Sequence, residues 1–134
     1  MRVFIDTDVL LDVYFGRDPH VKFSGPLLDW AESNPGKAAV SWHGLANVHY
    51  LSASGAEDFL RDLLRFCEIP ATGSNDMLRA LKLGFKDLED AMQTAAALKF
   101  NAQVIATRNT RDFRKSPIAV TTPKQLFAEL KLSG

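Results

Sequence analysis

The sequence predicts an α/β fold in which helices alternate with the strands of a parallel sheet. Short apolar runs alternate with longer segments of helical periodicity, an order typical of β-α-β units. With 134 residues, 46% of them apolar, residues 1–134 are expected to form one domain. The run Val3-Phe4-Ile5 leads directly into Asp6. Because ligands bind beyond the carboxyl ends of parallel strands, Asp6 is expected to project into the binding crevice.

The first half of the chain predicts three strands and four helices. Gly16 closes the first helix, Pro35-Gly36 follows the second, and Ser41 can N-cap the third. The expected elements are a strand at 2–5, helices at 8–15 and 19–33, a strand at 37–40, helices at 41–52 and 55–66, and a weak strand at 67–70. In the helix at 55–66, the side chains expected to face inward are Phe59, Leu60, Leu63 and Leu64.

The second half continues the alternation. The expected elements are helices at 75–83 and 87–100, strands at 103–106 and 118–120, and a final helix at 123–130. Asp87 can cap the helix that follows it, with Glu89 in its first turn. Ala91 and Ala95 mark the buried face, and Asp90 lies one position away from it. Asp90 is therefore expected to border the core and face the crevice.

Composition limits the partners and the compartment. The 16 Lys and Arg residues balance 16 Asp and Glu residues, so any contact with nucleic acid must depend on a local basic cluster. The single cysteine, Cys67, lies in an apolar context and cannot form an internal disulfide, which fits a reducing, cytoplasmic compartment. No apolar run is long enough to cross a membrane, and no signal peptide is expected.

The segment after the strand at 103–106 turns abruptly polar. Thr107, Asn109 and Asp112 are short oxygen-bearing side chains, expected beside Asp6 if the two strands are neighbours. The same segment carries four cations that would suit phosphate oxygens: Arg108, Arg111, Arg114 and Lys115.

Three carboxylates from distant parts of the chain are expected to meet in the crevice. Asp6, Asp90 and Asp112 would form an oxygen-only cluster, which cannot stay fully ionised without a cation. Hard oxygen ligands select Mg²⁺ or Mn²⁺ over zinc. The three histidines lack the spacing of a helical zinc site and are not expected to be ligands.

Four segments together resemble the PIN domain, as found in VapC-type toxin ribonucleases. They are Asp6-Thr7-Asp8-Val9-Leu10-Leu11-Asp12, Leu88-Glu89-Asp90-Ala91-Met92-Gln93, Ala106-Thr107-Arg108-Asn109 with Asp112-Phe113, and Ser116-Pro117-Ile118 leading to Thr122-Pro123. The resemblance implies a Mg²⁺- or Mn²⁺-dependent ribonuclease on a three-layer α/β/α sandwich with a central parallel sheet. It also implies a protein that is often a homodimer and often inhibited by a small antitoxin.

The resemblance assigns roles residue by residue. Asp6 matches the first acid of the family and Asp90 the third, so both are expected to be catalytic metal ligands. Asn47 stands where the family usually has Glu, and Asn109 stands where it has Asp. The acidic residue nearest to Asn109 is Asp112. Asn47 keeps a carbonyl oxygen that can serve as a ligand, but it removes one negative charge. Thr107, Asn109, Asp87 and Glu89 are expected to support the site.

The expected chemistry is metal-assisted hydrolysis of an RNA phosphodiester, in which Mg²⁺ held by Asp6, Asp90 and Asp112 activates a water. Arg108, Arg111, Arg114 and Lys115 would bind the RNA. Two alternatives remain open. A haloacid dehalogenase-type phosphatase would use Asp6 as nucleophile and Asp8 as general acid. A PIN-like binding module of low activity would explain the amides Asn47 and Asn109.

Overall fold

A five-stranded, fully parallel sheet forms the centre of the protein. The computed structural model describes residues 1–53 and 55–133, with side chains as far as residue 130. The strands are β1 (Val3–Ile5), β2 (Ala38–Ala39), β3 (Cys67–Glu68), β4 (Val104–Ala106) and β5 (Ala119–Thr121). Their order across the sheet is β3-β2-β1-β4-β5, with parallel pairing throughout. The predicted parallel α/β fold is confirmed.

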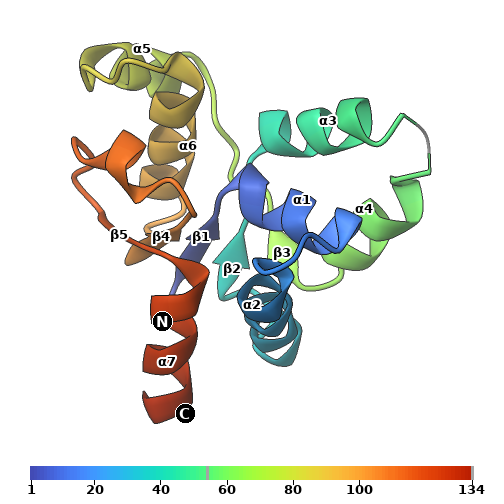
Figure 1. The fold of residues 1–134 in the computed structure, drawn as a ribbon. Helices are drawn as coiled ribbons and strands as arrows, with labels where there is room; N and C mark the ends of the chain where they lie inside the picture. The colour runs from blue at the N-terminus through green and yellow to red at the C-terminus, as the bar shows by residue number, and fades with distance from the viewer. Residues whose placement is uncertain (54, 134) are drawn as a thin grey trace.

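Helices cover both faces of this sheet, which gives the expected three-layer sandwich (Figure 1). The described residues form α1 (Thr7–Phe15), α2 (Val21–Ser33), α3 (Trp42–Leu51), α4 (Glu57–Leu63), α5 (Ser74–Lys82), α6 (Leu88–Lys99), α7 (Pro123–Ser133) and a short 3₁₀ helix, η1 (Thr110–Phe113). The α5–α6 pair lies on one side of the sheet and α1 to α4 lie on the other. Within the described chain, no helix is both long and apolar enough to cross a membrane.

Strand β1 shows how the core is divided between the two faces. Val3 and Ile5 pack with residues of α1, α2 and α7, whereas Phe4 packs with residues of α6 and with Phe113 of η1. All three β1 side chains are buried, because side chains alternate across a strand that is covered on both faces.

The predicted helix ends are largely confirmed by their caps. Ser41 caps α3, and Asp87 accepts bonds from Glu89 N and Asp90 N, as expected. Asp6 accepts a hydrogen bond from Thr7 N and is a further N-cap that was not predicted. Gly16 ends α1 in the left-handed conformation. These side chains satisfy backbone N–H groups that have no partner inside the helix.

Two expectations are corrected. The helix predicted at 55–66 spans only Glu57–Leu63, so Leu64 lies beyond its end and is exposed rather than directed inward. The polar segment after β4, for which no helix is expected from the sequence, contains η1 at residues 110–113, which buries Phe113 against the core.

Helix α3 packs very closely against the start of α1. A Cβ atom at Gly44 would lie 2.6 Å from Thr7 Oγ1 and 2.7 Å from Ser41 Oγ. Such distances leave no room for a side chain, so Gly44 allows α3 to approach the segment that carries Asp6.

We predict that Gly44→Ala destabilises the protein, although Ala is normally the better helix former. The expected loss is about 1–3 kcal/mol, because α3 or α1 must shift to admit the methyl group. Urea denaturation measures it. Gly25→Ala in α2 is the control: its Cβ meets nothing within 4 Å, and the gain in helix propensity is partly offset by the following Pro26, so little change is expected. Equal stability of the two variants would contradict the prediction.

Candidate active site

Asp6 lies at the carboxyl end of β1, where the sheet order reverses between β1 and β4. This is where open α/β sheets form their ligand crevice. The Asp6 side chain is 6% exposed. Its Oδ1 accepts hydrogen bonds from Thr7 N (2.9 Å) and Gln93 Nε2 (2.8 Å), and its Oδ2 accepts one from Thr107 Oγ1 (2.7 Å). Thr107 therefore lies beside Asp6, as expected for neighbouring strands.

Gln93 was not predicted as part of the site. It is buried in α6, and its Nε2 also donates to Thr7 Oγ1 at 3.1 Å. A signal was present in the sequence, because Gln93 lies three residues after Asp90 and therefore on the same side of the helix. Gln93 links α6 to the end of β1 and orients the Asp6 carboxylate.

Asp8 occupies a more central place than the sequence suggested. Its Oδ2 accepts hydrogen bonds from Arg108 N (3.1 Å) and Asn109 Nδ2 (3.2 Å), while its buried Oδ1 has no partner among the described residues. Burial, and then the charge of Asp6, raise the pKa of Asp8 to about 7, despite the opposing effect of Arg108. A partly buried carboxylate with a free oxygen and a raised pKa is suited to bind a cation.

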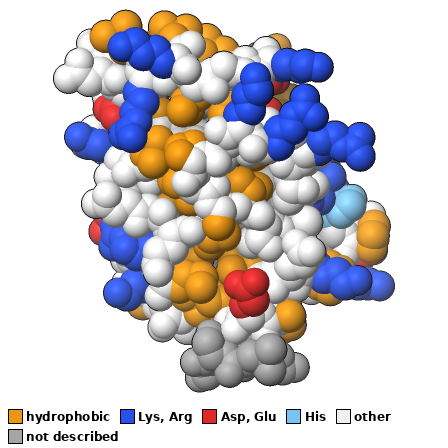
Figure 2. All heavy atoms as spheres, turned by 90° about the vertical axis from the view of Figure 1, so that its left-hand side faces the viewer, with side chains coloured by type: hydrophobic (Ala, Val, Ile, Leu, Met, Phe, Trp, Pro, Cys, Tyr) orange, Lys and Arg blue, Asp and Glu red, His pale blue; other side chains and the backbone are white. Residues whose placement is uncertain are grey.

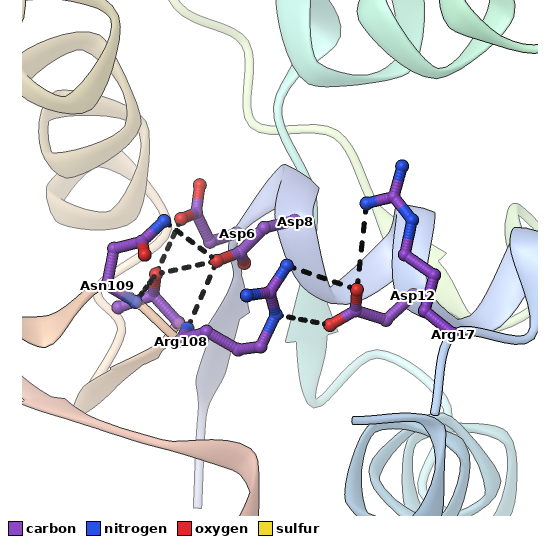
Figure 3. Close-up of polar contacts among 7 residues, drawn as sticks. Asp6, Asp8, Asp12, Arg17, Arg108 and Asn109 are labelled. Carbon is purple, nitrogen blue, oxygen red and sulfur yellow. Dashed lines mark hydrogen bonds and ion pairs between the residues drawn. The ribbon is translucent and has the colours of Figure 1, made fainter. Parts of the chain in front are cut away.

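The guanidinium of Arg108 is paired with Asp12 of α1. Its Nε and Nη2 donate to the two Asp12 oxygens at 2.6 and 3.2 Å, and Asp12 is fully buried (Figure 3). Arg17 Nη1 lies 3.7 Å from the same carboxylate. Arg108 is therefore not the free cation that the sequence suggested: its backbone holds Asp8, and its side chain neutralises Asp12.

Asp90 and Asn47 reach the same pocket as Asp6 and Asp8. The residues that line it include Asp6, Asp8, Asn47, Glu89, Asp90 and Asn109; we call it the acidic pocket. Asn47 Nδ2 donates to Glu89 Oε1 at 3.0 Å, which brings α3 and α6 together across the opening. Burial, and then the charges of Asp6, Asp87 and Asp112, raise the pKa of Asp90 to about 7.

Asp112 does not line the acidic pocket, but it shares a neighbouring pocket with Asp90. It lines a second pocket with Asp87, Asp90 and four basic residues, Lys86, Arg111, Arg114 and Lys115; Asp6 does not line this pocket. The expected cluster of Asp6, Asp90 and Asp112 is thus spread over two pockets that share Asp90. Lys115 Nζ donates to Gly84 O at 3.0 Å. Figure 2 shows the left-hand side of the molecule as drawn in Figure 1, where Lys and Arg side chains are most numerous in the upper part.

The acidic pocket fits a hard divalent cation in its donor chemistry. Its side chains offer carboxylate and amide oxygens, and Asp8 Oδ1 is a buried acceptor without a donor. In the part of the chain that the structure describes, no three Asp, Glu, His or Cys side chains converge as a ready ligand set. Mg²⁺ does not require one, since it is usually held by one or two carboxylates and keeps several waters.

Comparison with known proteins identifies the family. The family model described as "PIN domain" matches residues 2–111. The chain belongs to the PIN-domain family. Asp6, Asp90 and Asn109 all lie inside the matched segment, and this membership replaces the phosphatase alternative based on Asp6 and Asp8.

Several relatives of this PIN domain are recognisable. It is 25% identical to Ribonuclease VapC1 of Aquifex aeolicus (strain VF5) over 92% of either chain. It also resembles a chain in a toxin–antitoxin complex from Klebsiella pneumoniae (28% identity, TM-score 0.63, 92% of this chain and 98% of that one). A chain of VapBC2 from Rickettsia felis bound to a promoter DNA fragment shares the fold at 18% identity (TM-score 0.65, 91% and 98% coverage).

We predict that Asp8→Asn stabilises the metal-free PIN domain at high pH. The pKa of Asp8 is about 7 in the folded protein and about 3.8 in the unfolded chain, so ionisation of Asp8 weakens folding as pH rises through that interval. The variant should melt a few degrees above wild type above pH 7, and the difference should vanish near pH 4.

Thermal melts in EDTA across this pH range test the prediction. Asp29→Asn, which removes an exposed carboxylate from α2, is the control and should give no such trend. A constant difference between wild type and Asp8→Asn at every pH would contradict the assignment.

Proposed function

We propose that this PIN domain is a Mg²⁺- or Mn²⁺-dependent endoribonuclease that acts in the cytoplasm as the toxin of a toxin–antitoxin pair. The observation that carries the proposal is the acidic pocket at the carboxyl end of β1, whose lining includes Asp6, Asp8 and Asp90. The similarity to Ribonuclease VapC1 and to a chain of a toxin–antitoxin complex supports the substrate class and the biological role.

The residues of the acidic pocket would have different roles in binding the cation. A bound divalent cation would supply electrostatic stabilisation at the scissile phosphate and lower the pKa of a coordinated water. Asp6 is held rigid by Gln93 and Thr107 and would present a fixed ligand. Asp8 and Asp90 would lose a proton as the cation enters, because both titrate near pH 7 without it. Asn47 and Asn109 would add neutral oxygens.

The second pocket supplies the basic surface that RNA requires. Arg111, Arg114 and Lys115 lie next to Asp90 and Asp112, so an RNA backbone can contact these cations while its scissile phosphate faces the acidic pocket. Asp87, the N-cap of α6, and Glu89, in its first turn, support this edge. We assign RNA binding to these three residues first, because the charge of Arg108 is shared with Asp12.

Exposed apolar side chains support the proposed protein partners. Trp42, Tyr50 and Leu51 of α3 are 73%, 82% and 52% exposed, and Leu78 and Leu81 of α5 are 55% and 58% exposed. Clustered exposed apolar side chains commonly mark protein interfaces. Tyr50 and Leu51 also line the acidic pocket, so an antitoxin bound there would cover it. We also propose a homodimer, because these exposed apolar side chains of α3 and α5 could pack against a second copy of the chain.

A catalytically weak binding module is the second candidate, favoured by the amides of Asn47 and Asn109 in the acidic pocket. Mn²⁺ titration separates the two functions, because a binding module need not take up the metal.

We predict that Asp6→Asn abolishes RNA cleavage and leaves the fold intact. The amide keeps one acceptor for Gln93 and can turn its NH₂ toward the Thr107 hydroxyl, which can also accept. The measurement is RNA cleavage with Mg²⁺ or Mn²⁺, together with thermal melting with and without metal. Full cleavage by the folded variant would exclude the proposed metal site.

We predict that Asn47→Glu tightens Mn²⁺ binding and increases cleavage at low metal concentration. The new carboxylate would face Glu89 in place of the present hydrogen bond, and a cation would relieve the repulsion. Calorimetry on both proteins measures the affinity. Asn75→Glu, which adds the same charge on an exposed part of α5, should change nothing. Unchanged or weaker Mn²⁺ binding by Asn47→Glu would place Asn47 outside the site.

A further inference from the structure

A third pocket lies on the far side of Arg108 from the acidic pocket. It is formed where the start of α2 meets the junction of β5 and α7, and its lining includes His20, Phe23, Ser24, Arg108, Thr122 and Lys124. We call it the α2–α7 pocket. None of the described residues that line it is acidic, which is the reverse of the acidic pocket. Since the charge of Arg108 is shared with Asp12, it is chiefly the charge of Lys124 that favours an anion in this pocket.

The donors in the α2–α7 pocket are not fully used within the protein. Ser24 is fully buried, yet its Oγ has no hydrogen-bond partner in the described structure. A buried hydroxyl without a partner is unfavourable, and a ligand that accepts its hydrogen bond would remove that penalty.

The two long cations provide further donors. Arg108 uses only its Nε and Nη2 on Asp12, and a guanidinium carries five N–H groups, so others remain available to a ligand. The Lys124 ammonium lies 5.5 Å from the centre of the Phe23 ring and forms no ion pair among the described residues.

Arg108 connects this pocket directly to the proposed catalytic centre. Its backbone N–H donates to Asp8 in the acidic pocket, whereas its side chain lines the α2–α7 pocket. The residue before it, Thr107, is bonded to Asp6. Arg108, the second residue after β4, therefore contacts both pockets, which an extended ligand could occupy together.

We propose that the α2–α7 pocket binds a backbone phosphate of the RNA strand, next to the phosphate that is cleaved in the acidic pocket. This inference rests on the proposed ribonuclease function. Ser24 and Lys124 would donate to the phosphate oxygens, with Arg108 between the two sites. The strand would then be held on both sides of the scissile bond, by this pocket on one side and by Arg111, Arg114 and Lys115 on the other.

The test measures binding of a short single-stranded RNA of mixed sequence to the full chain in EDTA, so that cleavage does not interfere. Lys124→Gln should weaken binding and reduce the slope of log affinity against log salt by about 0.7, the value for one lost contact with single-stranded RNA. Ser24→Ala should weaken binding about fivefold without changing the slope, because it removes a neutral donor. Ser24→Ala should also fold at least as well as wild type, since the hydroxyl is unpaired.

Lys22→Gln is the matched control, because Lys22 is an exposed lysine of α2 that does not line the pocket. It should leave affinity and slope near wild-type values. Inorganic phosphate alone, added as a competitor, should displace RNA from the wild type more effectively than from Lys124→Gln.

The outcomes are distinct. Wild-type slope and affinity in Lys124→Gln would overturn the subsite while leaving the proposed ribonuclease function intact. If wild type binds inorganic phosphate but neither Lys124→Gln nor Ser24→Ala changes RNA binding, the pocket would be assigned to free phosphate. That result would also overturn the RNA subsite. A wild type that bound no RNA would refute the RNA function itself, and the subsite with it.

Discussion

The arrangement of this site depends on the hydrogen bonds that the Asp6 carboxylate accepts. It accepts hydrogen bonds from the start of α1, from α6 and from the end of β4, three segments far apart in the chain. A buried carboxylate requires such donors, because an unpaired buried charge is strongly unfavourable. The need to supply Asp6 with hydrogen-bond donors therefore determines how the helices and strands meet where the sheet order reverses, between β1 and β4. The other residues of the acidic pocket are arranged around this carboxylate.

Asp12 imposes a second constraint of the same kind. It is fully buried in α1, and its two oxygens are bound by the Arg108 guanidinium, with Arg17 nearby. Breaking such a buried pair by removing one partner commonly costs about 3–5 kcal/mol. The pair ties the segment after β4 to α1, and so holds the backbone N–H of Arg108 at hydrogen-bonding distance from Asp8.

Local patterns in the sequence were sufficient for the parallel α/β class, whereas the three-layer sandwich was expected from the resemblance to the PIN domain. The strand-helix alternation, the capping residues Ser41 and Asp87, and Gly16 are all signals read within a few neighbouring residues. The position of Asp6 beside Thr107 followed from the parallel sheet. The pairing of Arg108 with Asp12 could not be predicted in this way, because it depends on the relative placement of α1 and the end of β4. The same holds for the partition of Asp90 and Asp112 between two pockets.

Leu64 and η1 show the limit of periodicity. An apolar residue at helical spacing is expected inside, but α4 ends one residue before Leu64. The backbone after β4 winds into a 3₁₀ turn because Phe113 can be buried against α6. In both places tertiary contacts decide the local structure.

The raised pKa values of Asp8 and Asp90 have a calorimetric consequence. Near neutral pH, both side chains hold protons for part of the time in the metal-free protein. A cation entering the acidic pocket would displace those protons into the solvent. The heat measured on binding would then include the heat with which the buffer takes them up. Titrations in buffers of different ionisation enthalpy would count the protons released as the metal binds.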